Sequence, residues 1–173
     1  KVGAGKLTMM GNNTYKGSSI AANGTLAIDG SVTGDAWSIQ DSSAGMTGTL
    51  TGKGSIGGNL YNEGILQPSA EGNLTVKGNL KSTGSIGLVT TDSGQSARQI
   101  VVGGTAKVDG SVLVPVNGNL YLPKVNYSFL TAAGGITGTM TTAFSGLLNA
   151  ELTASADGRT ETAVLRAADN VGG

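Results

Sequence analysis

The pattern that decides the fold occupies residues 48–68, GTLTGKGSIGGNLYNEGILQP. Within it, a glycine, a small polar residue and an aliphatic residue follow one another at Gly48–Leu50, Gly54–Ile56 and Gly58–Leu60. Each aliphatic residue sits in a short alternating segment, and alternation with a period of two is typical of a half-buried β-strand. Glycine and asparagine adopt positive φ more easily than other residues, so we expect them to bend the chain between strands.

The same unit recurs along the chain. It is found again at Gly24–Leu26, Gly72–Leu74, Gly78–Leu80, Gly84–Ile86 and Gly118–Leu120, and Asp-Gly-Ser-Val occurs at both Asp29–Val32 and Asp109–Val112. The predicted strands are Lys6–Met9, Thr25–Asp29, Thr49–Thr51, Asn59–Tyr61, Gly64–Gln67, Asn73–Lys77 and Ala106–Asp109. Two or three such strands in each stretch of about 20 to 25 residues is the period of a solenoid. Because parallel crossovers are right-handed, we predict an all-β fold with a right-handed parallel β-helix over residues 1–110.

The pattern changes near residue 110. The later apolar segments, at Val112–Val116, Tyr127–Thr131, Leu147–Ala150 and Thr162–Arg166, are longer and contain less glycine. Bulky residues also gather here, since four of the seven aromatic residues lie between Tyr121 and Phe144. We predict that residues 111–173 form a β-rich module that caps the coil, because an open coil end exposes unpaired strand edges. Its expected core residues are Tyr127, Phe129, Leu130, Phe144 and Leu165.

Composition excludes several classes of function. The chain has 173 residues with no Cys and no His, which removes disulfides, thiol catalysis, Ser-His-Asp hydrolysis and most zinc, copper and haem ligation. The 11 basic residues balance the 11 acidic ones, so binding of nucleic acid through bulk charge is excluded. The longest apolar run, Val112–Val116, contains Pro115 and is far shorter than the roughly 18 residues of a membrane-spanning helix. The start of the chain has no initiating Met and no signal region, so we expect a segment of a longer protein.

Two patterns that carry chemistry elsewhere are explained by turns here. Gly52–Gly57 has the glycine spacing of a dinucleotide-binding loop, but another short strand follows it where that loop requires a helix. The carboxylates are scattered at irregular intervals, and Asp29, Asp109 and Asp157 stand in Asp-Gly pairs that are typical of turns. We therefore predict no catalytic residues, no metal site and no cofactor, and hence a protein that is not an enzyme.

Several stretches resemble the passenger domains of bacterial type V autotransporters. Residues 3–17, GAGKLTMMGNNTYKG, fit a Gly-x-Gly-x-Leu-x-x-x-Gly-x-Asn-Thr-Tyr-x-Gly repeat that ends in Gly-Thr-Leu, here at Gly24–Leu26. Residues 49–68 are similar to the start of the C-terminal passenger region, and Tyr127–Ala132 with Gly135–Gly138 resembles its terminal module. The chain departs from the family at Gln67–Ala70, where Pro-Gly is more common. The resemblance covers nearly the whole chain.

The resemblance implies an autochaperone, a segment that folds first as it leaves the outer-membrane pore and templates the rungs that precede it. The implied partners are the upstream passenger rungs and a downstream outer-membrane β-barrel of the same polypeptide, together with periplasmic chaperones. The implied location is the bacterial cell surface, reached by secretion through the periplasm. Whether the upstream part is an adhesin, a subtilisin-like protease, an esterase or a toxin is not encoded in these residues.

The alternative is a β-helix of a surface virulence factor that binds a host molecule or binds or cleaves carbohydrate. Trp37 is either an anchor of a rung or a binding residue, and both interpretations stay open. If it binds, Asp35 and Asp41 are the nearby residues to examine. A groove lined by two or more convergent carboxylates would favour this alternative.

Overall fold

The computed structural model describes residues 1–14, 16–91, 96–113, 124–143 and 148–167. Every regular element in these residues is a β-strand, which confirms the all-β prediction. The strands form three sheets with extensive parallel pairing. No helix long and apolar enough to cross a membrane occurs in the described part of the chain.

The three sheets are named A, B and C. Sheet A contains β1 (Lys6–Met9), β4 (Gly24–Ile28), β8 (Met46–Thr51), β11 (Ile65–Leu66), β14 (Ser85–Gly87), β17 (Gly110–Leu113) and β20 (Met140–Ala143), with β7 (Gln40–Asp41) paired to β8. Sheet B contains β2 (Asn12–Asn13), β5 (Ser31–Val32), β9 (Ser55–Ile56), β12 (Leu74–Val76), β15 (Ile100–Val102), β18 (Lys124–Ala132), β22 (Thr160–Ala167) and β21 (Leu148–Ala154). Sheet C contains β3 (Ser19–Ala21), β6 (Ala36–Ser38), β10 (Leu60–Asn62), β13 (Leu80–Ser82), β16 (Ala106–Val108) and β19 (Ile136–Thr137).

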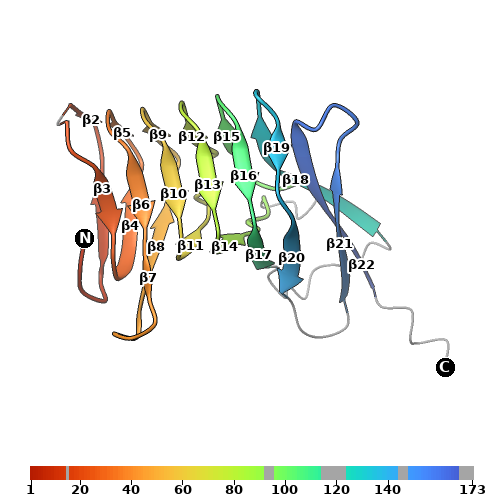
Figure 1. Cartoon of the computed structure of the whole chain (residues 1–173), viewed down its shortest axis with the longest axis horizontal. Helices are drawn as coiled ribbons and strands as arrows, with labels where there is room; N and C mark the ends of the chain where they lie inside the picture. The colour runs from red at the N-terminus through yellow and green to blue at the C-terminus, as the bar shows by residue number, and fades with distance from the viewer. Residues whose placement is uncertain (15, 92–95, 114–123, 144–147, 168–173) are drawn as a thin grey trace.

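The chain visits the sheets in a fixed order. From β1 to β20 it passes through sheet A, sheet B and sheet C and then returns to sheet A, apart from the extra strand β7. Each strand pairs in parallel with the strand of the same sheet from the preceding cycle. The sheets therefore extend together from the N-terminal end to β20, as Figure 1 shows.

The core between the sheets consists of aligned aliphatic rows. In sheet A, one such row runs in register through Leu26, Leu50, Leu66, Ile86 and Val112, each at most 2% exposed. Fully burying one side chain of this size contributes about 1.5–3 kcal/mol. The residues next to them in sequence alternate to the outer face, which explains the alternation in the sequence.

A polar row interrupts the core along sheet C. Ser38, Asn62 and Ser82 occupy equivalent register positions, and each is at most 1% exposed. The Ser38 hydroxyl donates to the Asn62 amide oxygen, and Asn62 Nδ2 donates to Ser82 Oγ and to the Ser85 carbonyl, both at 2.9 Å. These bonds satisfy buried polar atoms that would otherwise cost about 1–3 kcal/mol each. The sequence alone did not predict this row.

The described asparagines do not bend the chain through a positive φ, contrary to the expectation from the sequence. In the described residues only glycine adopts positive φ, so the prediction that asparagine bends the chain in this way is wrong for these residues. Their side chains instead accept bonds from the backbone of the next layer: Asn59 Oδ1 from Asn79 N at 2.9 Å, and Asn79 Oδ1 from Thr105 N at 2.9 Å. An amide oxygen thus satisfies a donor at the start of a strand, which a positive φ would not do.

The interval between layers is not constant. It is 24 residues from Asp35 to Asn59 and 20 from Asn59 to Asn79, but 26 from Asn79 to Thr105 and 30 from Asp109 to Thr139. The last two exceed the expected 20 to 25 residues. Only the strands must match in length from layer to layer, so extra residues are accommodated in the connections.

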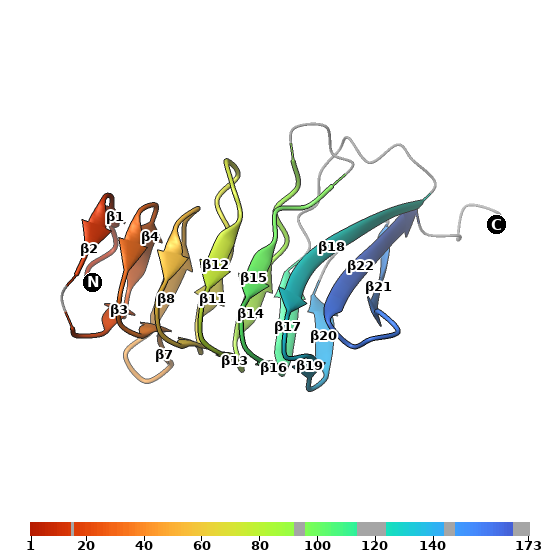
Figure 2. The same cartoon turned by 90° about the horizontal axis from the view of Figure 1, so that it is seen from above.

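The last two described strands of the chain, β21 and β22, pair antiparallel. β18 pairs in parallel with β15 on one side and antiparallel with β22 on the other, and β22 then pairs antiparallel with β21. Figure 2 shows β18, β22 and β21 side by side at this end of the molecule. The predicted boundary between residues 110 and 111 falls within β17.

Candidate functional site

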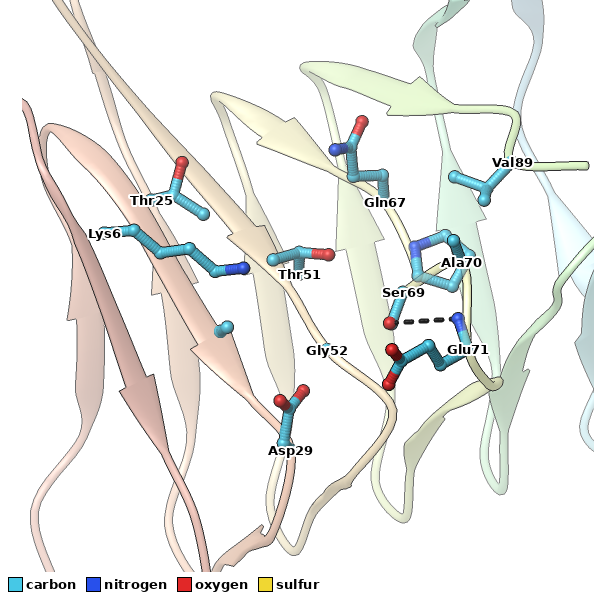
Figure 3. Close-up of a pocket in the computed structure, with 12 residues that line it drawn as sticks. Lys6, Thr25, Asp29, Thr51, Gly52, Gln67, Ser69, Ala70, Glu71 and Val89 are labelled. Atoms are coloured by element: carbon cyan, nitrogen blue, oxygen red, sulfur yellow. Dashed lines mark hydrogen bonds between the residues drawn. The ribbon is translucent and has the colours of Figure 1, made fainter.

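An open groove of about 570 Å³ lies over sheet A, in the N-terminal half of the molecule (Figure 3). Thr25 and Ala27 of β4 and Thr51 of β8 line it, together with Gly52 just after β8. The segment between β11 and β12 also lines it, with Gln67, Pro68, Ser69, Ala70 and Glu71. The remaining lining residues are Lys6, Asp29 and Val89.

Hydrogen bonds hold the segment 67–72 in place. The Ser69 amide donates to the Gly52 carbonyl at 2.9 Å, which ties the segment to the end of β8. Within the segment, the Glu71 amide donates to Ser69 Oγ at 3.1 Å. Arg98 Nε donates to the Ala70 carbonyl at 2.9 Å. The segment therefore forms a fixed wall beside the sheet, and Glu71 projects from it.

The charged groups in the groove and the neighbouring Lys53 come from separate layers. Lys53 Nζ lies 2.9 Å from Glu71 Oε2, and the Lys53 amide donates to Asp29 Oδ1 at 3.4 Å. The hydrogen bond from Lys53, followed by its positive charge, lowers the pKa of Glu71, and the same pair raises the pKa of Lys53. Glu71 is therefore ionised at neutral pH and is unsuited to act as a general acid, a role that requires a raised pKa.

Figure 3 shows the side chains of Lys6, Asp29 and Glu71 pointing toward the same space. Two carboxylates thus line one groove, the feature named above as favouring the alternative of a surface β-helix that binds a host molecule or binds or cleaves carbohydrate. Sequence reasoning assigned Asp29 to a turn and saw no partner for Glu71. These residues lie far apart in the chain, so only the stacking of β4, β8 and β11 brings them together.

Trp37 lies on the outer face of sheet C and is partly exposed. It pairs in register with Tyr61, and the two rings stack with centroids 4.1 Å apart and an interplanar angle of 22°. Both rings line a smaller cavity of about 310 Å³, with Asn62, Glu63, Lys81 and Thr83.

Asp35 and Asp41 do not line that cavity. Asp35 Oδ1 accepts the Asn59 amide at 2.8 Å and so caps the next layer. Asp41 accepts Ser43 Oγ at 2.7 Å in the turn between β7 and β8, and this bond is the main reason that its pKa is lowered. The two carboxylates proposed to accompany Trp37 therefore serve local structure.

Four of the five predicted core residues of the C-terminal region lie on β18 and β22. Tyr127 and Leu130 are fully buried and Phe129 is 2% exposed, and burial raises the pKa of Tyr127. Leu165 lies on β22, paired with Val125 of β18 and Ala150 of β21. Phe144 lies outside the described residues.

Other sequence candidates for chemistry have structural roles. The glycine-rich stretch 52–57 leads into β9, a strand, where a dinucleotide-binding loop would lead into a helix. Among the described residues, no group of three or more Asp or Glu side chains is placed to hold a metal ion. Asp157 accepts Ser155 Oγ at 2.5 Å and the Arg159 amide at 3.0 Å in the turn between β21 and β22.

Glu161 on β22 should make stability depend on pH. Burial raises its pKa in the folded protein, so its stabilising contribution is present below the unfolded pKa and is lost as pH rises through the folded value. We expect Glu161→Gln to raise the free energy of unfolding at pH 7, with the gain shrinking as pH falls toward about 4.3, the unfolded value. Denaturant titrations of both proteins between pH 4 and 8 measure this difference. Glu63→Gln, at an exposed position, is the control, and a gain from Glu161→Gln that does not change with pH would contradict the prediction.

Comparison with protein-family models and with curated protein sequences finds no match.

Proposed function

We propose that this chain is a right-handed parallel β-helix from the passenger of a bacterial autotransporter, and that its C-terminal part acts as a non-enzymatic autochaperone. In this proposal the C-terminal part folds first and templates the layers before it. That folding supports secretion through the periplasm and across the outer membrane to the cell surface. The partners would be upstream passenger layers and a downstream outer-membrane barrel of the same polypeptide, with periplasmic chaperones during transit.

The repeated passage through sheets A, B and C supports the β-helix. A chain that returns to the same sheet after each cycle, always pairing in parallel, winds around a common core. In such a coil each layer contacts mainly its neighbours, so a folded layer is a template for the next.

The antiparallel C-terminal strands carry the autochaperone proposal. β21 and β22 are joined by the short turn 155–159, and a hairpin of this kind forms in about 1–10 μs. A parallel pair of strands forms more slowly, because two other strands lie between its two members in the sequence. β22 then holds β18, whose buried Tyr127 and Leu130 complete the core beside β15. We therefore expect the C-terminal strands to form the folding nucleus.

The N-terminal end of the molecule supports the proposal that layers are added toward the N-terminus. Among the described strands, β1, β2 and β3 are the first of their sheets and have a partner on one side only. Leu7 of β1 stands in register with the buried row of Leu26 but is 48% exposed. Val2 and Met10 are also exposed, at 75% and 72%. A further layer pairing with these strands would cover such side chains.

The order of folding tests the proposal. In pulse-labelling hydrogen exchange during refolding of the full chain, we expect amides of β18, β21 and β22 to become protected before those of β1, β4 and β5. Solvent protection read by mass spectrometry or NMR at successive refolding times measures this order. Earlier protection of the N-terminal strands, or simultaneous protection of all strands, would contradict the autochaperone role.

A further inference from the structure

We propose that the groove over sheet A binds a neutral oligosaccharide. The proposal goes beyond the folding function and does not depend on it, since it rests on the geometry of the groove alone. The groove is concave, has a fixed wall and collects polar groups from several layers, which are the general features of a small-ligand site.

The charges of the groove favour a ligand without net charge. Lys6, Asp29 and Glu71 line the groove, and Lys53, which does not line it, offsets the charge of Glu71 through their ion pair. A phosphorylated, sulfated or nucleic-acid ligand would meet the carboxylates of Asp29 and Glu71, and a cationic ligand would meet the ammonium group of Lys6. The lining is mainly hydroxyl, amide and charged groups, which argues against a lipid or an apolar peptide.

The polar groups suit a ligand that carries many hydroxyls. Asp29 and Glu71 can accept hydrogen bonds from hydroxyl pairs, and Lys6 can donate. Thr25, Thr51 and Ser69 offer hydroxyls that both donate and accept. Charge-assisted hydrogen bonds of this kind are stronger than neutral ones, so the two carboxylates should dominate recognition.

The length of the groove favours an oligomer over a single sugar. Its residues come from four consecutive strands of sheet A or the segments beside them, from Lys6 on β1 to Gln67 after β11. Three intervals of about 4.8 Å between these strands give a length of roughly 14 Å. Ala27 and Gly52 contribute little side-chain bulk to the lining, which leaves room for sugar rings to lie along the sheet.

Binding rather than cleavage is expected. Both carboxylates interact with Lys53, and Glu71 is 74% exposed. Glycoside cleavage requires one carboxylic acid that keeps its proton near neutral pH, usually through burial. Glu71 is exposed and ion-paired, and neither condition keeps its carboxyl group protonated.

Titration of the full chain with defined trisaccharides tests the proposal. The probes are maltotriose, cellotriose and triacetylchitotriose, with 3′-sialyllactose as the acidic probe, each added up to about 20 mM and followed by amide chemical shifts in NMR. We expect at least one neutral probe to shift amides of β4, β8 and residues 67–72, with weaker response to the acidic probe. Absence of shifts with every neutral probe, shifts confined to the Trp37 and Tyr61 face, or tighter binding of the acidic probe would overturn it.

Variants separate ligand contact from loss of structure. We expect the double variant Asp29→Asn, Glu71→Gln to weaken binding at least tenfold, while Glu63→Gln on another face leaves it unchanged. Lys53→Gln removes the ion pair but keeps both carboxylates, so it should bind within threefold of the original chain. Amide spectra verify that each variant is folded. Equal binding by the double variant, or equal loss in Lys53→Gln, would contradict the assigned roles.

Discussion

Replacing Tyr127 with Ala is expected to lower the free energy of unfolding by about 3–5 kcal/mol. The ring is fully buried on β18, where the parallel and antiparallel parts of sheet B meet, and its truncation leaves a cavity at that junction. Denaturant unfolding followed by circular dichroism measures the loss. Tyr61→Ala is the matched control, because Tyr61 is partly exposed and stacks only at the surface, an interaction worth about 0.5–1.5 kcal/mol.

The same variant tests the proposed order of folding. If β18 belongs to the nucleus, Tyr127→Ala slows refolding in proportion to the stability it loses, whereas Leu26→Ala in β4 mainly speeds unfolding. Stopped-flow refolding and unfolding rates distinguish these outcomes. If the proposed secretion role holds, Tyr127→Ala in an autotransporter that contains this segment should also lower its display on the cell surface. Unchanged display with a measurably destabilised chain would count against the secretion role.

Gly48→Ala is the second change with a large expected effect, a loss of about 1–3 kcal/mol or more. Gly48 is buried on β8, and a β-carbon there would overlap the Ala21 carbonyl oxygen and lie 2.5 Å from its carbon. Both are backbone atoms of the preceding layer, so no side-chain rotation relieves the overlap. Its φ lies outside the positive range, and the predicted cost is therefore steric. Thermal unfolding measures it as a lower midpoint.

Two other glycines provide controls for this steric argument. Gly17→Ala adds a β-carbon with no atom within 4 Å and with φ outside the positive range, so we expect almost no change. Gly45 also has open space but a φ of 66°, so Gly45→Ala should cost only the conformational penalty of about 1–2 kcal/mol. If Gly17→Ala were as destabilising as Gly48→Ala, close approach of layers would not be the reason for glycine at position 48.

The local pattern predicted part of the strands: the seven ranges predicted before residue 110 all overlap strands of the structure, but others, such as β3, β6 and β15, were not predicted. Lys6–Met9 has the predicted bounds, and the two Gly-Thr-Leu units, at Gly24–Leu26 and Gly48–Leu50, stand directly beside each other in register. The alternation also indicated which residues face inward, since Leu26 and Leu50 are buried. Strand formation and burial of one face depend on neighbouring residues, which a sequence displays directly.

Similar sequence did not predict an equivalent place in the fold. Asp29–Val32 ends in β5 of sheet B, whereas the identical Asp109–Val112 leads into β17 of sheet A. The motif predicts a bend followed by an aliphatic residue that faces the core, and this local prediction is the same for both copies. Which sheet receives the strand depends on the number of strands that precede it in the cycle.

What the sequence determined by itself was therefore local: an all-β chain without thiol or imidazole chemistry, with glycine where the chain turns and aliphatic residues where it faces the core. Only the tertiary structure decided that Lys6, Asp29 and Glu71 share a groove and that Asn62 joins Ser38 and Ser82 in the core. The physical reason is that parallel stacking brings together residues from different cycles. Which residues meet depends on the length of the connections between strands. These lengths are irregular, so a fixed period in the sequence does not reveal the contacts.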